Sequence, residues 1–408
     1  MDFAIKNIVI ATVIFGTILV IIFENRNPVK TIAWCMVLTF MPVIGLLLYI
    51  LFGMDNRHRR QIKDEDLSRL KGITEITQSD DILSEMPVPQ KPLADMLRKM
   101  NKSFLLSGND VEIITDFQTM SDRLIADIEG ARHHINMLFF KFEDDAAGRR
   151  IADALIRKSE EGVQVRLIYD DAGNLMVPRR FYRKLRKHGI QVRGFIRIFL
   201  PILSRDYNSR NHRKVVVIDG RVGYMGGMNI AQRYAEGLKW GIWRDTHMRI
   251  TGPAVSELQT SFLTDWKFTK GDEPDLDPMY PYNPPCGNTL MQIVTGGPMD
   301  KWNAMMQAYM TAIVSARSYA YLQSPYFIPP EPIMKVLQNA ALSGVDVRVM
   351  IPYRGDKGVL PPLASRSYIK EALNAGIRMY LYRKGYMHAK TLVIDDSLVT
   401  IGSTNLDF

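Results

Sequence analysis

The longest uninterrupted hydrophobic runs of the chain lie at its N-terminus. Ile8–Phe23 contains no charged residue, and after a short polar loop at Glu24–Lys30 the stretch Thr31–Gly53 continues for 23 residues without a charge. Each run approaches the roughly 20 residues that an α-helix needs to cross a bilayer. A second run directly after the first argues against a cleaved signal peptide. The pattern therefore predicts a transmembrane helical hairpin within residues 1–54.

Basic residues are unevenly distributed around this predicted hairpin. Two lie in the loop between the spans and four follow the second span: Arg26 and Lys30 in the loop, and Arg57, Arg59, Arg60 and Lys63 after it. Because cytoplasmic loops of membrane proteins are enriched in Lys and Arg, both ends of the hairpin are expected on the cytoplasmic side. We therefore expect a multi-pass membrane protein whose remaining residues lie in the cytoplasm.

Beyond residues 55–110, which are predicted to be a polar linker region with helical pieces such as Leu93–Met100, the hydrophobic pattern changes. Short apolar runs of strand length alternate with stretches in which apolar residues recur at helical spacing. Strands separated by helices of this length indicate βαβ units and a mostly parallel sheet. The predicted elements are a strand at Ile113–Asp116, a helix at Met120–Ala131 capped by Ser121, a strand at His134–Phe142, a helix at Asp145–Glu161 and a strand at Val163–Tyr169.

The same order of elements recurs after a proline-rich linker at residues 271–288. Ser343–Val349 echoes Glu161–Leu167 in sequence, and similar echoes precede and follow it. The chain is therefore predicted to be an α/β protein with two pseudo-twofold-related halves, residues 111–270 and 289–408, on mixed, mostly parallel sheets.

One motif occurs twice with identical spacing. The pattern H-x-K-x4-D-x6-G-[GS]-x-N covers residues 212–229 and returns at residues 388–405 without a gap. Two such matches are difficult to obtain by chance, so these residues are the leading candidates for a functional site. The first copy supplies His212, Lys214, Asp219, Gly227 and Asn229, and the second supplies His388, Lys390, Asp395, Ser403 and Asn405.

The residue types in this motif suit a phosphodiester. His and Lys two residues apart on a strand project from the same face. The Gly-Gly and Gly-Ser turns allow backbone N–H groups to approach an anion, and each Asn adds an amide donor. Two copies together would supply one imidazole to attack phosphorus and one to protonate the leaving oxygen. Asp219 and Asp395 lie on the opposite strand parity, which favours a supporting role. The other histidines (His58, His133, His134 and His188) have no such setting.

The doubled motif resembles that of the phospholipase D superfamily, and the rest of the chain, including its N-terminal membrane region, resembles the bacterial cardiolipin synthase branch. The resemblance implies an enzyme of the bacterial inner membrane with one active site between its two halves. It also implies a covalent phosphohistidine intermediate, with no cofactor and no metal. By family precedent His212 is the nucleophile and His388 the acid and base.

A carboxylate beside a catalytic imidazole fixes its tautomer and stabilises its cation. In the family an acidic residue beyond each motif does this for its own histidine, and Asp245 matches that position for His212. An ordinary salt bridge at a strand end is the alternative. The chain ends at Phe408, three residues after Asn405, so the second half is expected to be C-terminally truncated and to lack the matching acid for His388.

The expected reaction is the synthesis of cardiolipin and glycerol from two phosphatidylglycerols. Hydrolysis of a phospholipid or of nucleic acid is the competing enzymatic interpretation, and a lipid-binding scaffold is the non-enzymatic one. The net charge of +9 suits either anionic lipid or nucleic acid, and the predicted hairpin favours lipid. The expected partners are phosphatidylglycerol and other anionic lipids, not nucleic acid; pairing with a second copy of the chain as a homodimer is left open.

Two further features leave alternatives open. The basic helix predicted at Pro178–Arg193 and the apolar segment Phe195–Leu203 fit a lipid surface. They fit a solvated helix face and an ordinary buried strand equally well. Four residues just past strand ends in the second half are weaker site candidates: Tyr326, Phe327, Arg354 and Asp356.

Overall fold

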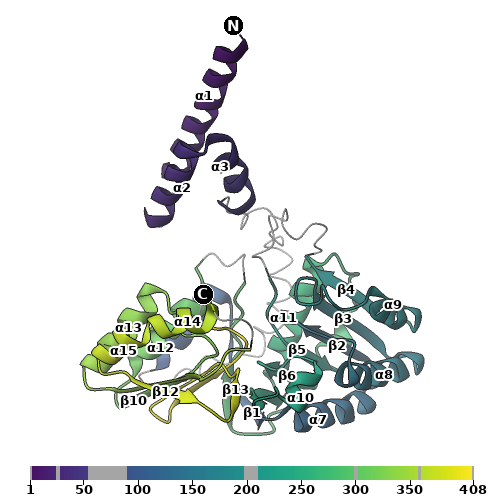
Figure 1. Cartoon of the computed structure of the whole chain (residues 1–408). Helices are drawn as coiled ribbons and strands as arrows, with labels where there is room; N and C mark the ends of the chain where they lie inside the picture. The colour runs from purple at the N-terminus through teal and green to yellow at the C-terminus, as the bar shows by residue number, and fades with distance from the viewer. Residues whose placement is uncertain are drawn as a thin grey trace. The chain divides into compact units, whose positions relative to one another are not determined.

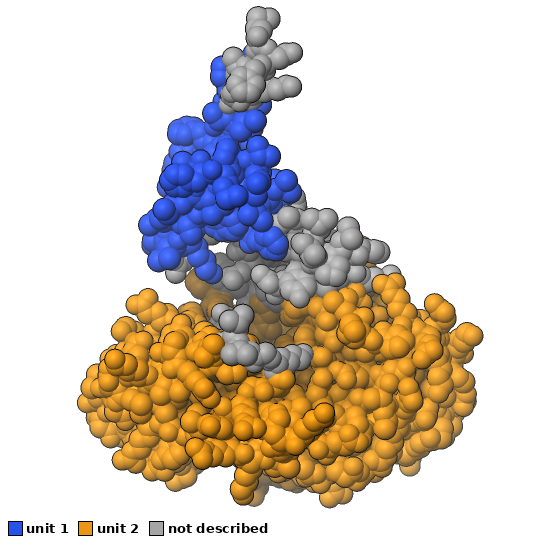
Figure 2. All heavy atoms as spheres, in the orientation of Figure 1, with its two compact units in different colours: residues 1–61, 198–209 blue, residues 62–197, 210–408 orange. Residues whose placement is uncertain are grey.

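The computed structural model describes residues 2–23, 28–53, 90–196, 210–297, 302–356 and 360–406. They fall into two compact units, shown in different colours in Figure 2: the N-terminal helices, and a larger unit that contains both copies of the motif. Each unit is described by itself. Residues 54–89 and 197–209, with most of the predicted linker and most of the apolar segment Phe195–Leu203, lie outside the described residues.

The N-terminal unit consists of the α-helices α1 (Asp2–Phe23), α2 (Pro28–Phe40) and α3 (Pro42–Leu48) and the π-helix η1 (Tyr49–Gly53). The second predicted span is divided by Pro42, which has no backbone N–H to continue α2 and instead begins α3. Ile21, Leu38 and Tyr49 form a small buried cluster, and most other apolar side chains face outward. Within the described part of the chain, no helix combines the length and the apolar character that crossing a membrane requires.

The first half of the larger unit is a mixed eight-stranded sheet in the order β4-β3-β2-β5-β6-β8-β1-β9. Only the β2–β3 and β3–β4 pairs are parallel. The α/β class and the mixed sheet are confirmed, but the prediction of mostly parallel sheets is wrong, because the two strands within each motif are antiparallel and joined by a tight turn. The strands are β1 (Leu105–Ile114), β2 (His134–Phe139), β3 (Gln164–Asp170), β4 (Gln191–Phe195), β5 (Val215–Ile218), β6 (Val222–Gly226), β8 (His247–Thr251) and β9 (Thr289–Gln292).

Helices cover both faces of this sheet (Figure 1). On one face α7 (Phe117–Gly130), α8 (Ala146–Glu160) and α9 (Arg179–Lys187) pack on a core that includes Met137 and Phe139. On the other face α11 (Val255–Phe268) packs against residues of the opposite strand parity, among them Val215 and Val217. Hydrophobic runs that appeared continuous in the sequence are therefore strands buried on both faces.

Aspartates cap the two long helices of the first half. Asp116 accepts a hydrogen bond from the backbone N–H of Thr119 (2.8 Å) at the start of α7, so the prediction of Ser121 as the cap is wrong. Asp145 accepts from the N–H of Gly148 (2.9 Å) at the start of α8. Each carboxylate satisfies a backbone N–H that has no partner within its helix.

The second half repeats this design with a five-stranded sheet in the order β12-β11-β10-β14-β15. Its core also receives Leu93 and Leu97 from α6 (Lys91–Asn101). With β1, α6 shows that the end of the predicted linker region 55–110 belongs to the folded unit. The other elements are β10 (Tyr319–Gln323), β11 (Asp346–Pro352), β12 (Arg378–Tyr382), β14 (Thr391–Ile394), β15 (Leu398–Ile401), α12 (Ala304–Ser315), α13 (Glu331–Leu342), α14 (Leu360–Ser367) and α15 (Ile369–Asn374).

A two-stranded parallel ladder joins the halves. It pairs β7 (Ile242–Arg244) with β13 (Gly385–Met387), and Arg244 lies opposite Met387. The backbone N–H of His388 continues the ladder by donating to the carbonyl of Arg244 (2.6 Å). The residue after each strand, Asp245 in the first half and His388 in the second, is therefore brought to the same place.

Candidate active site

Asp219 and Asp395 hold the backbone beneath the site. Asp219 accepts hydrogen bonds from the backbone N–H groups of Arg132, His133 and His134 at 2.7–2.9 Å. Asp395 accepts in the same way from three consecutive residues, 317–319, at the start of β10. Both aspartates have positive φ (52° and 50°), which Asp tolerates in a turn. The contacts support the predicted supporting role: each aspartate ties the end of the first motif strand, β5 or β14, to the start of the neighbouring strand, β2 or β10.

The carboxylate of Asp245 contacts His388, not His212. Its Oδ2 lies 2.7 Å from Nδ1 of His388, and both side chains are buried. The prediction that Asp245 orients His212 is wrong, as is the expectation that nothing in the chain serves His388. The physical reason is the β7–β13 ladder, a contact between strands far apart in sequence that the spacing within one half does not reveal.

His212 is held by the second half in turn. Its Nδ1 lies 2.8 Å from the carbonyl oxygen of Ser403. Because a carbonyl only accepts, the proton of the neutral imidazole resides on Nδ1 and the lone pair on Nε2. The ring also packs against Phe140, with 4.8 Å between centroids. Ser403 therefore supports the site through its backbone, a role that differs from the predicted contact with phosphate.

Both lysines of the motif are buried behind their histidines. Lys214 Nζ donates to the carbonyl of His212 (2.5 Å) and lies 5.4 Å from the centroid of the Phe140 ring. Lys390 Nζ donates to the carbonyl of His388 and lies 2.8 Å from its Nδ1. Nδ1 cannot donate to Asp245 and accept from Lys390 at once, and we assign its proton to the bond with the carboxylate, the stronger acceptor.

Gly227 makes room for the carboxylate. A Cβ at this position would lie 2.1 Å from Oδ1 of Asp245, so only glycine fits. The N–H of Gly227 donates to the carbonyl of Thr246 (2.8 Å) and is not turned toward an anion. The motif glycine thus acts through close packing, and not as the predicted backbone donor to phosphate.

The two motif asparagines differ in their contacts. Asn229 accepts from the N–H of Lys141 (3.1 Å) and donates to the hydroxyl of Tyr234 (2.8 Å), so both ends of its amide are engaged within the first half. Asn405 Oδ1 is buried, and no residue that the structure describes bonds to it. The predicted contact of both amides with phosphate stays a prediction.

Burial and mutual repulsion govern the charges of the site. Burial, followed by the positive charges of Lys214 and Lys390, holds the pKa of His212 well below its usual 6.5. Burial and Lys390 lower the pKa of His388 to about 4, against the opposing effect of Asp245. The pKa of Lys214 is also far below its usual value, because of burial and then of Lys390. Burial opposes ionisation of Asp245, but Lys390 and His388 lower its pKa nevertheless. Both imidazoles are therefore neutral near pH 7, and an anion entering the site would stabilise their protonated forms.

The sequence interpretation missed two further groups. The rings of Tyr234, Trp243 and Tyr386 surround His388, with centroids 6.2, 5.7 and 5.9 Å from its own. The buried carboxylate of Asp170, at the end of β3, accepts from the N–H of Asn211 (3.0 Å), beside His212. In the sequence, the one signal that could have identified Asp170 as a site residue was its position at the end of an apolar run of strand length.

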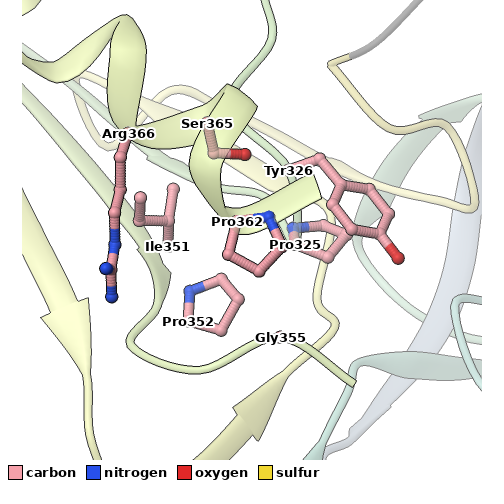
Figure 3. Close-up of a pocket in the computed structure, with 8 residues that line it drawn as sticks. All are labelled: Pro325, Tyr326, Ile351, Pro352, Gly355, Pro362, Ser365 and Arg366. Carbon is pink, nitrogen blue, oxygen red and sulfur yellow. The ribbon is translucent and has the colours of Figure 1, made fainter. Parts of the chain in front are cut away.

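A small pocket lies at the carboxyl ends of β10 and β11 (Figure 3). Three of its eight lining residues are prolines, and Tyr326, Ser365 and Arg366 are among the others. The hydroxyl of Tyr386 donates to that of Tyr326 (3.2 Å), which connects the pocket to the ring wall around His388. Of the weaker candidates, Tyr326 thus adjoins the site, and Asp356 contacts its hydroxyl at 3.4 Å. Phe327 is buried in the core, and the guanidinium of Arg354 lies over Trp240.

Two α/β halves that each place a His-x-Lys segment, just before a strand, at one shared site define a phospholipase D-like protein. The fold agrees with the crystal structure of phosphatidylserine synthase from Haemophilus influenzae Rd KW20. The two share a TM-score of 0.54 and 15% identity, over 76% of this chain and 80% of that one.

The chain belongs to the cardiolipin synthase family. The family described as "Cardiolipin synthase, PLD-like domain" matches residues 124–266 and 309–408, and the one described as "Phospholipase_D-nuclease N-terminal" matches residues 12–53. The major cardiolipin synthase ClsA of Bacillus subtilis is 37% identical over 99% of this chain and 85% of its own length. The cardiolipin synthase of Geobacillus kaustophilus is 38% identical over 95% of this chain and 78% of its own.

Proposed function

We propose that the chain is a phosphatidyltransferase that makes cardiolipin and glycerol from two molecules of phosphatidylglycerol. The observation that carries the proposal is the reciprocal support of the two histidines. His388 is held by Asp245 of the first half, and His212 is held by the Ser403 carbonyl of the second half. Each imidazole thus faces a site that exists only when both halves are assembled, as a two-step transfer with separate nucleophile and acid requires.

The neutral imidazole of His212 attacks the phosphorus of the first lipid through Nε2, because its Nδ1 proton is directed to the Ser403 carbonyl. The phosphorus–oxygen bond to glycerol breaks, and His388 donates its Nε2 proton to the leaving oxygen. A hydroxyl of the second phosphatidylglycerol then returns a proton to His388 and attacks the phosphatidyl-histidine. This step forms cardiolipin and restores free His212.

The negative charge of the phosphodiester fits the buried cations of the site. Lys214 and Lys390 lower the pKa of His212 by repulsion in the empty site, and a bound phosphate would relieve that repulsion. The anion would also raise the pKa of His388, so that this imidazole becomes charged when a substrate is present to be protonated. Asn405 would add a neutral donor. Asn229 would do so only by exchanging its bond to Tyr234 for one to phosphate.

The N-terminal helices would anchor the enzyme in the membrane that contains its substrate. The match to the N-terminal family over residues 12–53 and the outward-facing apolar side chains of α1 and α2 support this part of the proposal. The charge distribution around the helices favours a hairpin in the bacterial inner membrane, with the catalytic unit on the cytoplasmic side. Labelling of Cys286 by an impermeant reagent only after the cells are opened would test this orientation.

The test uses the full chain, a His212→Ala variant and a His133→Ala control in phosphatidylglycerol vesicles without divalent metal. His133 has an exposed side chain and no place in the mechanism. Mass spectrometry should detect cardiolipin and glycerol in equal amounts with the natural chain and the control, and neither product with His212→Ala. Phosphatidic acid in place of cardiolipin would show that water is the acceptor and that the enzyme is a hydrolase.

A further inference from the structure

Helix α9 presents a face of positive charge to solvent. Phe181, Tyr182 and Leu185 are buried and attach the helix to the first half. The Tyr182 hydroxyl donates to the carbonyl of Phe142 (2.9 Å), and its ring stacks on Tyr169 at 3.9 Å between centroids. The remaining side chains of the helix are all basic and exposed: Arg179, Arg180, Arg183, Lys184, Arg186 and Lys187.

Most of this charge is not neutralised by neighbouring groups. Lys184 pairs with Asp153 (3.2 Å), and Arg186 donates to the carbonyl of Val192. Within the described ranges, no carboxylate lies within ion-pair distance of Arg179, Arg180 or Arg183. The helix contains no acidic residue of its own. This face therefore has a high local density of uncompensated cations.

The turn before α9 carries two exposed apolar side chains. Met176 is 95% exposed and Leu175 is 48% exposed. The turn is held from within by Asn174, which donates to the carbonyls of Phe140 and Asp170, each at 2.8 Å. Its Oδ1 also accepts from the N–H of Phe142 (2.9 Å). The turn thus holds two adjacent apolar side chains in water, directly beside the basic face of α9.

The same turn is connected to the catalytic segment through Asp170. One oxygen of this buried carboxylate accepts from the N–H of Gly173 in the turn (3.0 Å), and the other accepts from the N–H of Asn211, next to His212. Phe140, whose carbonyl receives Asn174, packs on the ring of His212. The apolar turn that leads into α9 and the segment that carries His212 are therefore both attached to the carboxyl end of β3.

We propose that Leu175, Met176 and the cationic side chains Arg179, Arg180 and Arg183, together called the docking face, bind the surface of an anionic phospholipid bilayer. The two apolar side chains would enter the acyl region while the guanidinium groups contact headgroup phosphates, the arrangement by which basic amphipathic surfaces bind membranes. Docking would bring the lipid surface to the carboxyl end of β3, where Asp170 bonds both to the apolar turn and to the residue before His212. The proposal rests on the proposed function for the identity of that lipid as substrate.

The experiment places a fluorophore at position 176 of the full chain. A Met176→Cys variant, with both native cysteines replaced by serine, is labelled with NBD and reconstituted in nanodiscs of phosphatidylglycerol that contain lipids with a quencher in the acyl chain. The control is Leu342→Cys, an apolar position at the end of α13 that is 72% exposed. Quenching at position 176 but not at position 342 is expected, and it should be lost in nanodiscs of neutral phosphatidylcholine.

The charge contribution is tested by a triple variant, Arg179→Gln, Arg180→Gln and Arg183→Gln. With about a fivefold effect on binding for each cation near an anionic surface, the docking equilibrium should fall on the order of a hundredfold, and the quenching at position 176 should disappear. The matched control neutralises three exposed cations of the second half and should leave the quenching intact: Arg317, Lys335 and Lys370.

Several results would overturn the proposal. Equal quenching at positions 176 and 342, equal quenching in neutral lipid, or no effect of the triple variant would each exclude an anionic bilayer as the partner. A response at position 176 to a single-stranded oligonucleotide and not to lipid would assign the docking face to nucleic acid. Quenching does not depend on turnover, so a protein that docks but forms no cardiolipin would refute the proposed function alone.

Discussion

The contact between Asp245 and His388 predicts which chemical step an Asp245→Asn substitution slows. The substitution keeps an acceptor oxygen at nearly the same place and removes the charge. An ion pair of about 4 Å in a region of effective dielectric constant about 20 is worth about 4 kcal/mol, which corresponds to roughly a thousandfold in rate. Burial and Lys390 already hold the pKa of His388 at about 4. Loss of the one group that raises this pKa would leave even fewer protonated imidazoles to serve as the acid.

The assay compares two leaving groups in the first turnover. Release of glycerol from phosphatidylglycerol requires a proton, and release of p-nitrophenolate from phosphatidyl-p-nitrophenol does not. Asp245→Asn should therefore slow the first reaction about a thousandfold and the second less than about tenfold. An Asp122→Asn variant, on the exposed surface of α7, is the control and should match the natural chain. An equal loss with both substrates would mean that the carboxylate serves the nucleophile, and the assignment to His388 would be refuted.

Three further predictions follow from single contacts. Gly227→Ala should lower activity at least a hundredfold, because its Cβ would displace the Asp245 carboxylate, whereas Gly402→Ala, whose Cβ would meet nothing within 4 Å, should be tolerated in the same cardiolipin assay. Asp395→Asn should destabilise the fold by about 2 kcal/mol at pH 7, because it weakens three charge-assisted hydrogen bonds. The pKa of Asp395 is lowered in the folded state. In thermal unfolding, the difference in stability between the variant and the natural chain should therefore vanish as the pH falls below about 4. The pKa of buried His247 is about 4 in the folded chain and about 6.5 in the unfolded chain, so the unfolded chain binds more protons between these pH values and stability falls as the pH decreases through them. His247→Leu should remove about 3 kcal/mol of this acid sensitivity. Plots of unfolding free energy against pH that run parallel for the two chains would contradict the argument.

The sequence was informative where function depends on local spacing. The exact repeat of the motif identified both His-Lys pairs, and strand parity alone separated Asp219 and Asp395 from them. In the structure both pairs lie just before a strand, β5 or β14, rather than within it, so the spacing identified the segment and not its backbone conformation. The alternation of strand and helix also gave the α/β class correctly, since each βαβ unit is formed by neighbouring residues.

Inference from sequence failed where the partner lies in the other half. Asp245 stands 143 residues from His388, and only the pairing of β7 with β13 brings the two together. The same limitation applies to Gly227, which was interpreted as a phosphate donor from its Gly-Gly turn, because its close contact with Asp245 is not visible in the sequence. The antiparallel return from β5 to β6 and from β14 to β15, within each motif, was likewise missed, because the short turns that begin at Asp219 and Asp395 were not interpreted as hairpin turns.

The β7–β13 ladder also bears on what happens while the chain is being made. Domains generally fold in the order in which they leave the ribosome. The first half, with its own nucleophile and lysine, is therefore synthesised well before the strand that ends in His388. In the proposed mechanism this early species has no proton donor for a leaving alcohol. A nascent chain is thereby prevented from cleaving the lipids around it, and catalysis begins only after the last parallel strand of the ladder has paired.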